Sequence, residues 1–214
     1  MSAGSPIRQP RRAAAWLVAA ILAALPSCTA PRIPPELRWT VTRPVPTSPE
    51  ALTDELAAMV EIDQKLRREW VSVPGGKNPR GLMRKLRNVD HANTERMKRI
   101  VAKLGWPTIS EYGKKAPHLA WLLVQHAADP VFRSHCLDLM GPLLEKDEVR
   151  KDDFAYLTDR VLVLKGKAQR YGTQFHTVDG KLQPLPIEDA ANVDARRKEM
   201  GMPPLAEYRA SFKR

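Results

Sequence analysis

The polar side chains at the end of an otherwise apolar stretch are the residues best suited to chemistry. Residues 117–128 are apolar on almost every side of the helix that they predict, yet this stretch ends in Gln125 and His126, and Asp129 follows. A buried polar side chain without a partner costs about 1 to 3 kcal/mol. These three side chains must therefore find partners or water, and His126 is a candidate general acid or base.

A second polar group lies inside the helix predicted over residues 152–165. Asp159 and Arg160 have apolar neighbours on more than one side, so at least one of them is expected to be buried and paired. Adjacent residues do not face each other on a helix, so their partners must lie elsewhere. The nearest residues that are rich in donors and acceptors are Gln169, Tyr171, Thr173 and Gln174.

Two interpretations of these residues remain open. In the first, they line one cleft of a hydrolase, where Asp159 orients His126 as the acid or base. Arg160 or Tyr171 would then bind an anionic or carbonyl group. In the second, which the sequence favours, they form a buried hydrogen-bond network that holds a β-hairpin on the helices. The residues that would bind a ligand in the first interpretation are Gln125, Asp129, Arg160, Gln169, Tyr171 and Gln174.

The sequence predicts no metal site and identifies no cofactor. His118 and His126 are separated along one predicted helix by about 12 Å, so they cannot share a metal ion. The five histidines and two cysteines lack the spacing of zinc ligands, and no common catalytic motif or phosphate-binding glycine loop occurs. Cys136 lies on the apolar side of its predicted helix, which favours a buried structural thiol over a nucleophile.

The N-terminus has the three zones of a signal peptide over residues 1–27. Three arginines precede an apolar run over residues 13–25, and small residues follow. That run is about 13 residues, whereas a helix that spans a bilayer needs roughly 20. The end of the run resembles a lipobox that terminates in Cys28, although Pro26 departs from the usual pattern. We expect lipidation of Cys28 to hold the exported protein at a membrane surface of the bacterial envelope, with ordinary cleavage near Ala30 as the alternative.

The positive charge of the chain is concentrated in residues 65–103. The net charge is +11 and falls to +8 once the three arginines of the signal peptide are removed. Such a patch suits nucleic acid, anionic lipid or an acidic polymer. An exported protein rarely meets nucleic acid, so nucleic-acid binding is not expected. The patch is either a solvated helix face or a contact with an anionic component of the envelope.

The remaining patterns predict a mainly α-helical fold, a single domain with one small β-hairpin near the C-terminal third. Prolines recur through residues 28–50 and predict an extended tether. The domain then occupies residues 51–214, where Asp179 and Gly180 predict the turn of the hairpin. Apolar spacing predicts helices over residues 50–70, 89–104, 117–128, 130–144, 152–165, 189–200 and 203–212. Asp129 and Pro130 predict the N-cap and the first turn of the helix over residues 130–144.

Several short motifs resemble a known family. They are W-L-L-V-Q-H-A at 121–127, Y-L-T-D-R-V-L-V at 156–163, Y-G-T-Q at 171–174, G-W-P at the end of 93–107, the tail 186–208, and the pair Asp63 and Gln64. In this order they are similar to a bacterial domain of unknown function, number 6624. The resemblance covers most of the chain after Ala51, and the basic insert 77–87 and the export signal depart from it. It implies no established activity. We therefore expect an envelope protein that acts by binding or interaction, with a hydrolase that uses His126 and Asp159 as the alternative.

Overall fold

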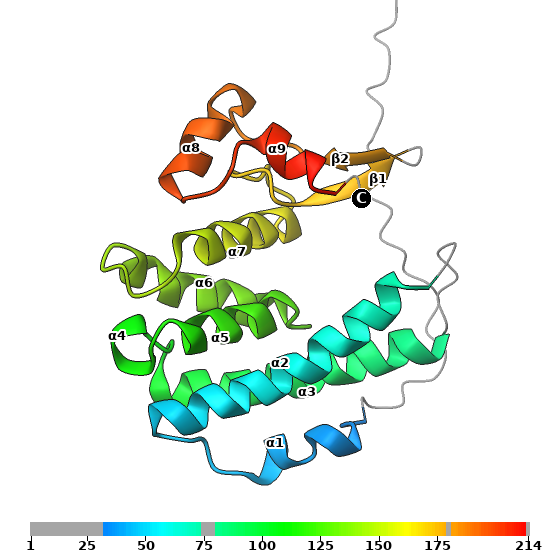
Figure 1. Ribbon diagram of the computed structural model, residues 1–214, viewed down its shortest axis with the longest axis vertical. Coiled ribbons are helices and arrows are strands. Elements are labelled where there is room, and N and C mark those ends of the chain that lie inside the picture. The colour runs from blue at the N-terminus through cyan, green and yellow to red at the C-terminus, as the bar shows by residue number, and fades with distance from the viewer. Residues whose placement is uncertain (1–31, 74–79, 179–180, 213–214) are drawn as a thin grey trace, which may run out of the picture. The chain divides into compact units, whose positions relative to one another are not determined.

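The computed structural model describes residues 32–73, 80–178 and 181–212. The predicted signal peptide, Cys28, and the hairpin turn at Asp179 and Gly180 lie outside these residues. The described residues form a mainly α-helical fold with one antiparallel hairpin, which confirms the predicted fold class (Figure 1). The elements are η1 (Pro35–Leu37), α1 (Trp39–Thr42), α2 (Pro49–Val71), α3 (Arg80–Leu104), α4 (Ile109–Tyr112), α5 (Lys115–Gln125), α6 (Pro130–Leu144), α7 (Lys151–Leu164), β1 (Phe175–Val178), β2 (Lys181–Pro184), η3 (Ala190–Asn192), α8 (Val193–Glu199) and α9 (Leu205–Ala210).

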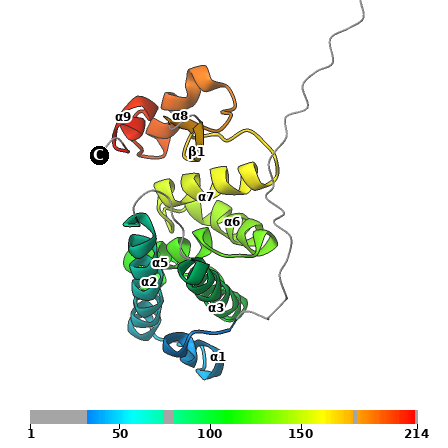
Figure 2. The ribbon, with the colours of Figure 1, turned by 90° about the vertical axis from the view of Figure 1, so that its right-hand side faces the viewer.

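The helices of residues 32–212 stack in layers. The long helices α2 and α3 lie side by side, and α5 packs on both of them (Figures 1 and 2). Helix α7 packs on α5 and α6, and the hairpin with α8 and α9 lies on the far side of α7. None of the described helices is both long enough and apolar enough to cross a membrane.

Helix α2 illustrates how the sequence sets these elements. The Ser48 hydroxyl accepts a hydrogen bond from the backbone N–H of Ala51 at 3.2 Å, and Pro49 occupies the first turn, so the helix has a regular N-terminal cap. Leu52, Leu56 and Met59 are fully buried on one face. That face joins the larger apolar core with residues of α3, α5, α6 and α7, which includes Met97, Ile100, Val124, Cys136, Met140 and Leu157.

Helix α3 is longer than predicted because it begins at Arg80 rather than near Val89. Leu86 and Val89 are buried at helical spacing and extend its apolar face toward the N-terminus. The sequence did not predict this part of the helix, because only a few apolar residues recur among the basic residues between 80 and 88.

Residues 32–48 differ from the extended tether expected over residues 28–50. Leu37 is fully buried and Val45 is nearly so, and both belong to the core. The Arg96 side chain donates hydrogen bonds to the carbonyls of Arg43 at 2.7 Å and Pro44 at 3.0 Å. Prolines interrupt backbone pairing in this segment, so arginine side chains from α3 satisfy its carbonyls instead. The folded domain therefore starts before Ala51.

The basic residues of 65–103 divide into two groups as a result. Arg96 is fully buried and also pairs with Glu55 at 2.6 Å, while Arg99 and Lys103 donate to carbonyls of residues 40–45. These side chains hold the fold together rather than form a solvated face. The second group consists of exposed basic residues that are not engaged in this way: Lys65, Arg68, Arg84, Lys85 and Arg87.

Candidate functional site

Asp159 binds the loop that leads into the hairpin. Its carboxylate is fully buried in α7 and accepts hydrogen bonds from the backbone N–H groups of Arg170 at 2.7 Å, Tyr171 at 3.0 Å and Thr173 at 2.9 Å. The Thr173 hydroxyl donates a further bond at 2.9 Å. Tyr171 and Thr173 were among the predicted partners, but they contribute mainly backbone donors. A carboxylate with four donors is satisfied, so its role is structural.

Gln169 continues this network into the hairpin. Its amide nitrogen donates to the carbonyls of Gln174 at 3.0 Å and Leu185 at 2.8 Å, and its amide oxygen accepts from the backbone N–H of Gln174 at 2.8 Å. The Tyr171 carbonyl accepts a bond from Arg197 at 2.7 Å. Gln169, Tyr171 and Gln174, predicted as ligand-binding residues, are therefore engaged in the network that holds the hairpin on α7.

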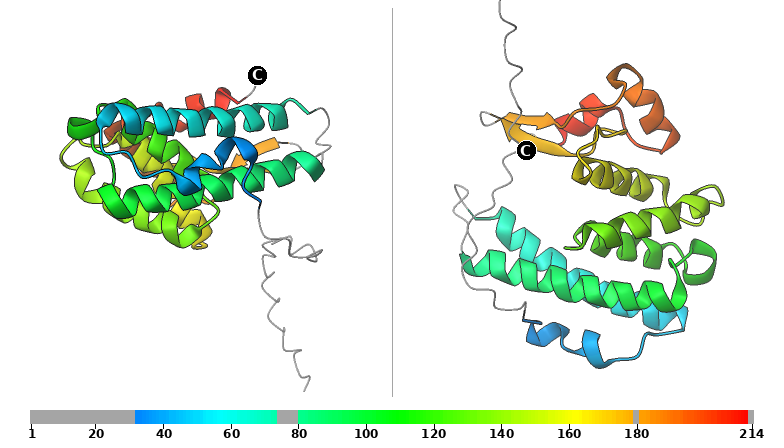
Figure 3. Two further views of the ribbon diagram at one scale, coloured as in Figure 1. Left: turned by 90° about the horizontal axis from the view of Figure 1, so that it is seen from below. Right: turned by 180° about the vertical axis from the view of Figure 1, so that it is seen from behind.

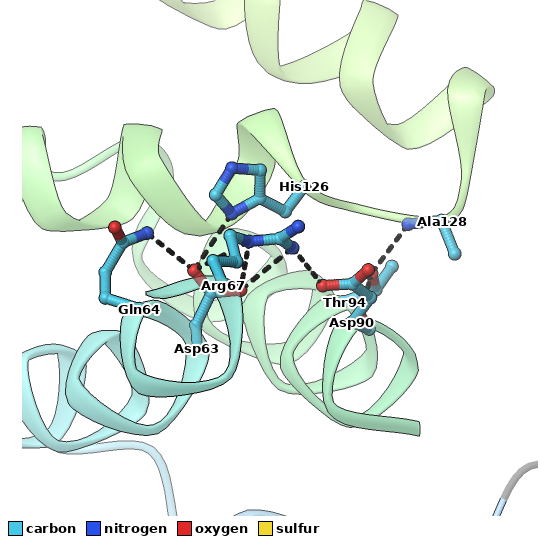
Figure 4. A network of polar contacts seen from close by, with 7 residues as sticks. All are labelled: Asp63, Gln64, Arg67, Asp90, Thr94, His126 and Ala128. Carbon is cyan, nitrogen blue, oxygen red and sulfur yellow. Dashed lines mark hydrogen bonds and ion pairs between the residues drawn. The ribbon is translucent and has the colours of Figure 1, made fainter. Parts of the chain in front are cut away.

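His126 lies at the C-terminal end of α5 and pairs with Asp63 of α2 instead of Asp159. The two atoms, Nδ1 of His126 and Oδ2 of Asp63, are 3.0 Å apart (Figure 4). The first interpretation placed Asp159 beside His126, and the structure gives each of them a different partner. Because Asp63 is almost fully buried, the bond fixes the ring with its Nδ1 hydrogen on the carboxylate. Nε2 then carries the free lone pair, and the His126 side chain is 20% exposed.

Asp63 connects this histidine to an arginine. Its carboxylate also accepts hydrogen bonds from Gln64 at 2.8 Å and from Nε of Arg67 at 3.1 Å (Figure 4). Burial alone would raise the pKa of Asp63, but the hydrogen bonds and charges of His126 and Arg67 together lower it. Burial lowers the pKa of His126, in spite of the Asp63 carboxylate. The pair is therefore an ionised aspartate beside a neutral imidazole near neutral pH.

Arg67 forms a second ion pair with Asp90 of α3. Burial raises the pKa of Asp90 to about 6, and the attraction of Arg67 offsets only part of this effect. The side chain of Asp90 is only 19% exposed, so water solvates its charge poorly. Asp90, unlike Asp63, is thus partly protonated in mildly acidic solution.

Two further guanidinium groups, from α6 and α7, lie near Arg67. Nε of Arg160 donates a hydrogen bond to the amide oxygen of Gln125 at 2.6 Å. Burial lowers the pKa of Arg160, and the positive charges of Arg133 and Arg67 lower it further. Nε of Arg133 is buried and has no hydrogen-bond partner among the described residues. We call Arg67, Arg133 and Arg160 the arginine cluster.

One member of the cluster, Arg67, lines a shallow hollow of about 360 Å³ beside α2, whereas Arg133, Arg160 and His126 are not among its lining residues. Gln64 and Arg67, which both bind Asp63, line it together with Arg68, Val71 and Ser72. The cluster and the neighbouring His126 together offer guanidinium donors and one imidazole nitrogen, which suit an anionic oxygen. Within residues 32–73, 80–178 and 181–212, no three His, Cys, Asp or Glu side chains lie close enough to ligate a metal ion.

Two other predicted residues have structural positions. Asp129 is the N-cap of α6, as the sequence predicted, and its carboxylate accepts from the backbone N–H groups of Val131 at 2.9 Å and Phe132 at 3.0 Å. It also pairs with Lys98 at 2.9 Å. Cys136 is fully buried, and burial raises its thiol pKa to about 12, so the prediction of a buried structural cysteine is confirmed.

Sequence reasoning missed Arg67, Asp90 and Arg133, and it noted Asp63 only as part of a family motif. A signal for Asp63 exists. It continues the buried stripe of Leu56 and Met59 on α2 at helical spacing, and a carboxylate on such a stripe requires a buried partner. The sequence does not say which residue that partner is, because His126 comes from a distant helix.

Comparison with known proteins places the chain among relatives. The model of a family of unknown function (DUF6624) matches residues 50–213. The chain belongs to this family. No curated protein and no solved structure is similar enough to match it. The DUF6624 region starts with α2 and extends beyond α9, so it contains the whole arginine cluster, Asp63 and His126, whereas the packed segment 32–48 precedes it.

Proposed function

We propose that this DUF6624 protein binds an anionic ligand at the arginine cluster. One observation carries the proposal: three guanidinium groups share a partly buried region with two carboxylates, and within the described residues neither Arg133 nor Arg160 forms a close ion pair, although the charges of Asp90 and Asp129 attract Arg133. Burying positive charge without a partner is unfavourable unless something compensates it. An oxyanion bound between these groups supplies the missing negative charge.

The chemistry of the cluster selects the class of ligand. A guanidinium presents planar paired donors that match the oxygens of a carboxylate or a phosphate. Nε2 of His126 adds one position that can accept a proton from a protonated oxygen or donate one when the ring is charged. Asp90 opposes anion binding when it is ionised, so the affinity depends on its protonation state.

Titration calorimetry of the full chain with inorganic phosphate and with acetate tests this proposal. Arg133→Gln and Arg160→Gln each remove one charge-assisted donor and should weaken anion binding about tenfold or more. Arg209→Gln is the matched control, because Arg209 is exposed on α9. The anion that binds more tightly indicates whether the acidic group of the ligand is a phosphate or a carboxylate. If neither anion binds, or if the control weakens binding as much as the cluster variants, the proposal is refuted.

A second candidate, a hydrolase, rests on the His126–Asp63 pair. A buried carboxylate on Nδ1 leaves Nε2 to take a proton from water, and the arginine cluster would hold the anionic group of the substrate. Asp63 replaces Asp159 as the orienting residue in this version. Turnover of carboxylic and phosphoric ester substrates that is lost in His126→Gln, while phosphate affinity persists, would establish it. Anion binding without turnover of any ester supports the binding protein.

We further propose that the protein is exported and anchored through a lipid on Cys28 in the cell envelope. The support is the signal-like pattern of residues 1–28. Intact mass and membrane fractionation should show a lipidated chain that starts at Cys28 in the wild type and in Cys136→Ala, but not in Cys28→Ala. An unprocessed chain in the cytoplasm would exclude export.

A further inference from the structure

A cavity of about 660 Å³ lies between the N-terminal segment and the two long helices. On α2 its lining residues run from Glu61 to Glu69, and on α3 from Arg84 to Val89, each set on one helix face. The segment of residues 32–38 closes the third side. This segment lies across α2 and α3, as the view from below shows (Figure 3). The cavity shares no residue with the arginine cluster.

The wall of the cavity is apolar along its deeper side. Ile62 and Leu66 of α2 and Val89 of α3 belong to the core or pack against it, and Ile33 faces them from the N-terminal segment. Pro34 and Pro35 complete this wall, and proline has no backbone N–H to offer a polar ligand. An apolar chain can therefore lie here without leaving a polar group unsatisfied.

The rim of the cavity is positively charged. Five cationic side chains and three carboxylates line it, and no ion pair joins any of them to another described residue. The cations are Arg32, Arg38, Lys65, Arg84 and Lys85, and the carboxylates are Glu36, Glu61 and Glu69. Long basic side chains extend over apolar surface and keep their charges at its edge. The rim of the apolar cavity thus carries two more positive than negative charges.

We propose that this cavity binds an anionic amphiphile with a single apolar chain. The volume lies within the range of small-molecule pockets, and an apolar wall with a few convergent charges is their usual composition. The apolar chain lies against Leu66, Val89 and Ile33, and the acidic head group contacts Lys65 and Lys85. Charge complementarity thus fixes the sign of the ligand and the apolar wall fixes its amphiphilic character. The site assigns a role to exposed basic residues of 65–103 that the fold does not use.

Binding of dodecanoate to the full chain that carries Cys28→Ala, measured by calorimetry below the micellar concentration, tests the inference. Dodecyltrimethylammonium is the matched ligand, because it has a chain of nearly the same length and the opposite charge. Dodecanoate should bind saturably with one molecule per chain and more tightly than the cation. Lys65→Glu with Lys85→Glu should weaken dodecanoate binding about tenfold. Lys114→Glu with Lys115→Glu makes the same change in net charge on an exposed corner away from the cavity, and should leave binding unchanged.

A second variant probes the apolar wall without a change in charge. Leu66→Trp fills the slot and should abolish dodecanoate binding, and a circular dichroism spectrum like that of the wild type shows that the chain is folded. Equal binding of the two surfactants, or equal weakening by both charge reversals, would overturn the inference. Absence of dodecanoate binding would also overturn it, as expected if residues N-terminal to Arg32 fill the cavity. Phosphate binding at the arginine cluster is unaffected by any of these outcomes.

Discussion

Replacing Asp90 with asparagine should change how the stability of the protein depends on pH. Burial raises the pKa of Asp90 from 3.8 to about 6, so the folded state holds this proton more tightly than the unfolded state. The contribution of Asp90 to the free energy of unfolding is therefore greatest below about pH 4. It falls as the pH rises to about 6 and stays constant above that.

The size of the effect follows from the shift in pKa. Each pKa unit corresponds to 1.36 kcal/mol, so a shift of about two units makes the ionised folded state less stable by about 3 kcal/mol. The Asp90 side chain is only 19% exposed, so solvent screening reduces this value little. Asparagine resembles the protonated aspartate and cannot ionise. The difference in free energy of unfolding between Asp90→Asn and wild type should thus shift by about 3 kcal/mol in favour of the variant between pH 4 and pH 8.

Guanidinium chloride unfolding at several pH values, followed by circular dichroism, measures this difference. Subtracting the two proteins removes the contribution of His126, whose lowered pKa makes stability rise with pH over an overlapping range. Asp129→Asn is the control of opposite sign. Hydrogen bonds from the backbone and from Lys98 lower the pKa of Asp129, so its stabilising effect is lost only below about pH 4. A pH-independent difference for Asp90→Asn, or one of the opposite sign, would refute the reasoning.

Four further outcomes are expected. Arg96→Met leaves Glu55 buried without its cation and should lower the free energy of unfolding by about 3 to 5 kcal/mol, and an added Glu55→Leu should restore much of it in chemical denaturation. Asp159→Ala removes the acceptor of three backbone N–H groups, so it should cost about 3 kcal/mol and speed amide exchange in residues 170–173. The Cys136 thiol should resist alkylation at pH 8 until the chain unfolds, in a variant without the other cysteine, because burial raises its pKa to about 12. Acetate stays ionised near pH 6, so its affinity for the arginine cluster should rise as the pH falls through about 6, and Asp90→Asn should abolish most of this rise.

Local patterns in the sequence were sufficient for most of the fold. The apolar spacing of α2, α5, α6 and α7 predicted each of these helices, and Asp129 was correctly predicted as the N-cap of α6. These features depend on residues a few positions apart, where periodicity and capping act directly. The segment 32–48 was predicted poorly, because its packing depends on Arg96 and Arg99, which are more than fifty positions from the carbonyls that they bind.

The same distinction between local patterns and contacts of distant residues explains which parts of the candidate site could be predicted. The structure pairs Asp159 with residues that follow it closely, and the sequence identified that neighbourhood. His126 and Asp63 are 63 positions apart, so their contact depends on how α5 packs against α2. The arginine cluster draws on three helices, and no local pattern connects them. Arg160 was singled out, but its bond to Gln125 on α5 could not be foreseen from spacing.

The two polar regions differ in whether folding accounts for them. Around Asp159 every acceptor position of the carboxylate meets a donor, and the result is a closed network that fixes a loop. Around Arg67 the charges and hydrogen bonds are not fully matched. The pKa of Asp90 is raised well above its ordinary value, and Nε of Arg133 has no hydrogen-bond partner in the described residues. A fold gains stability when such groups are replaced by apolar ones, so their presence calls for a cause other than folding. The anion binding that we propose would be such a cause, because one negative charge would relieve the repulsion among all three guanidinium groups at once.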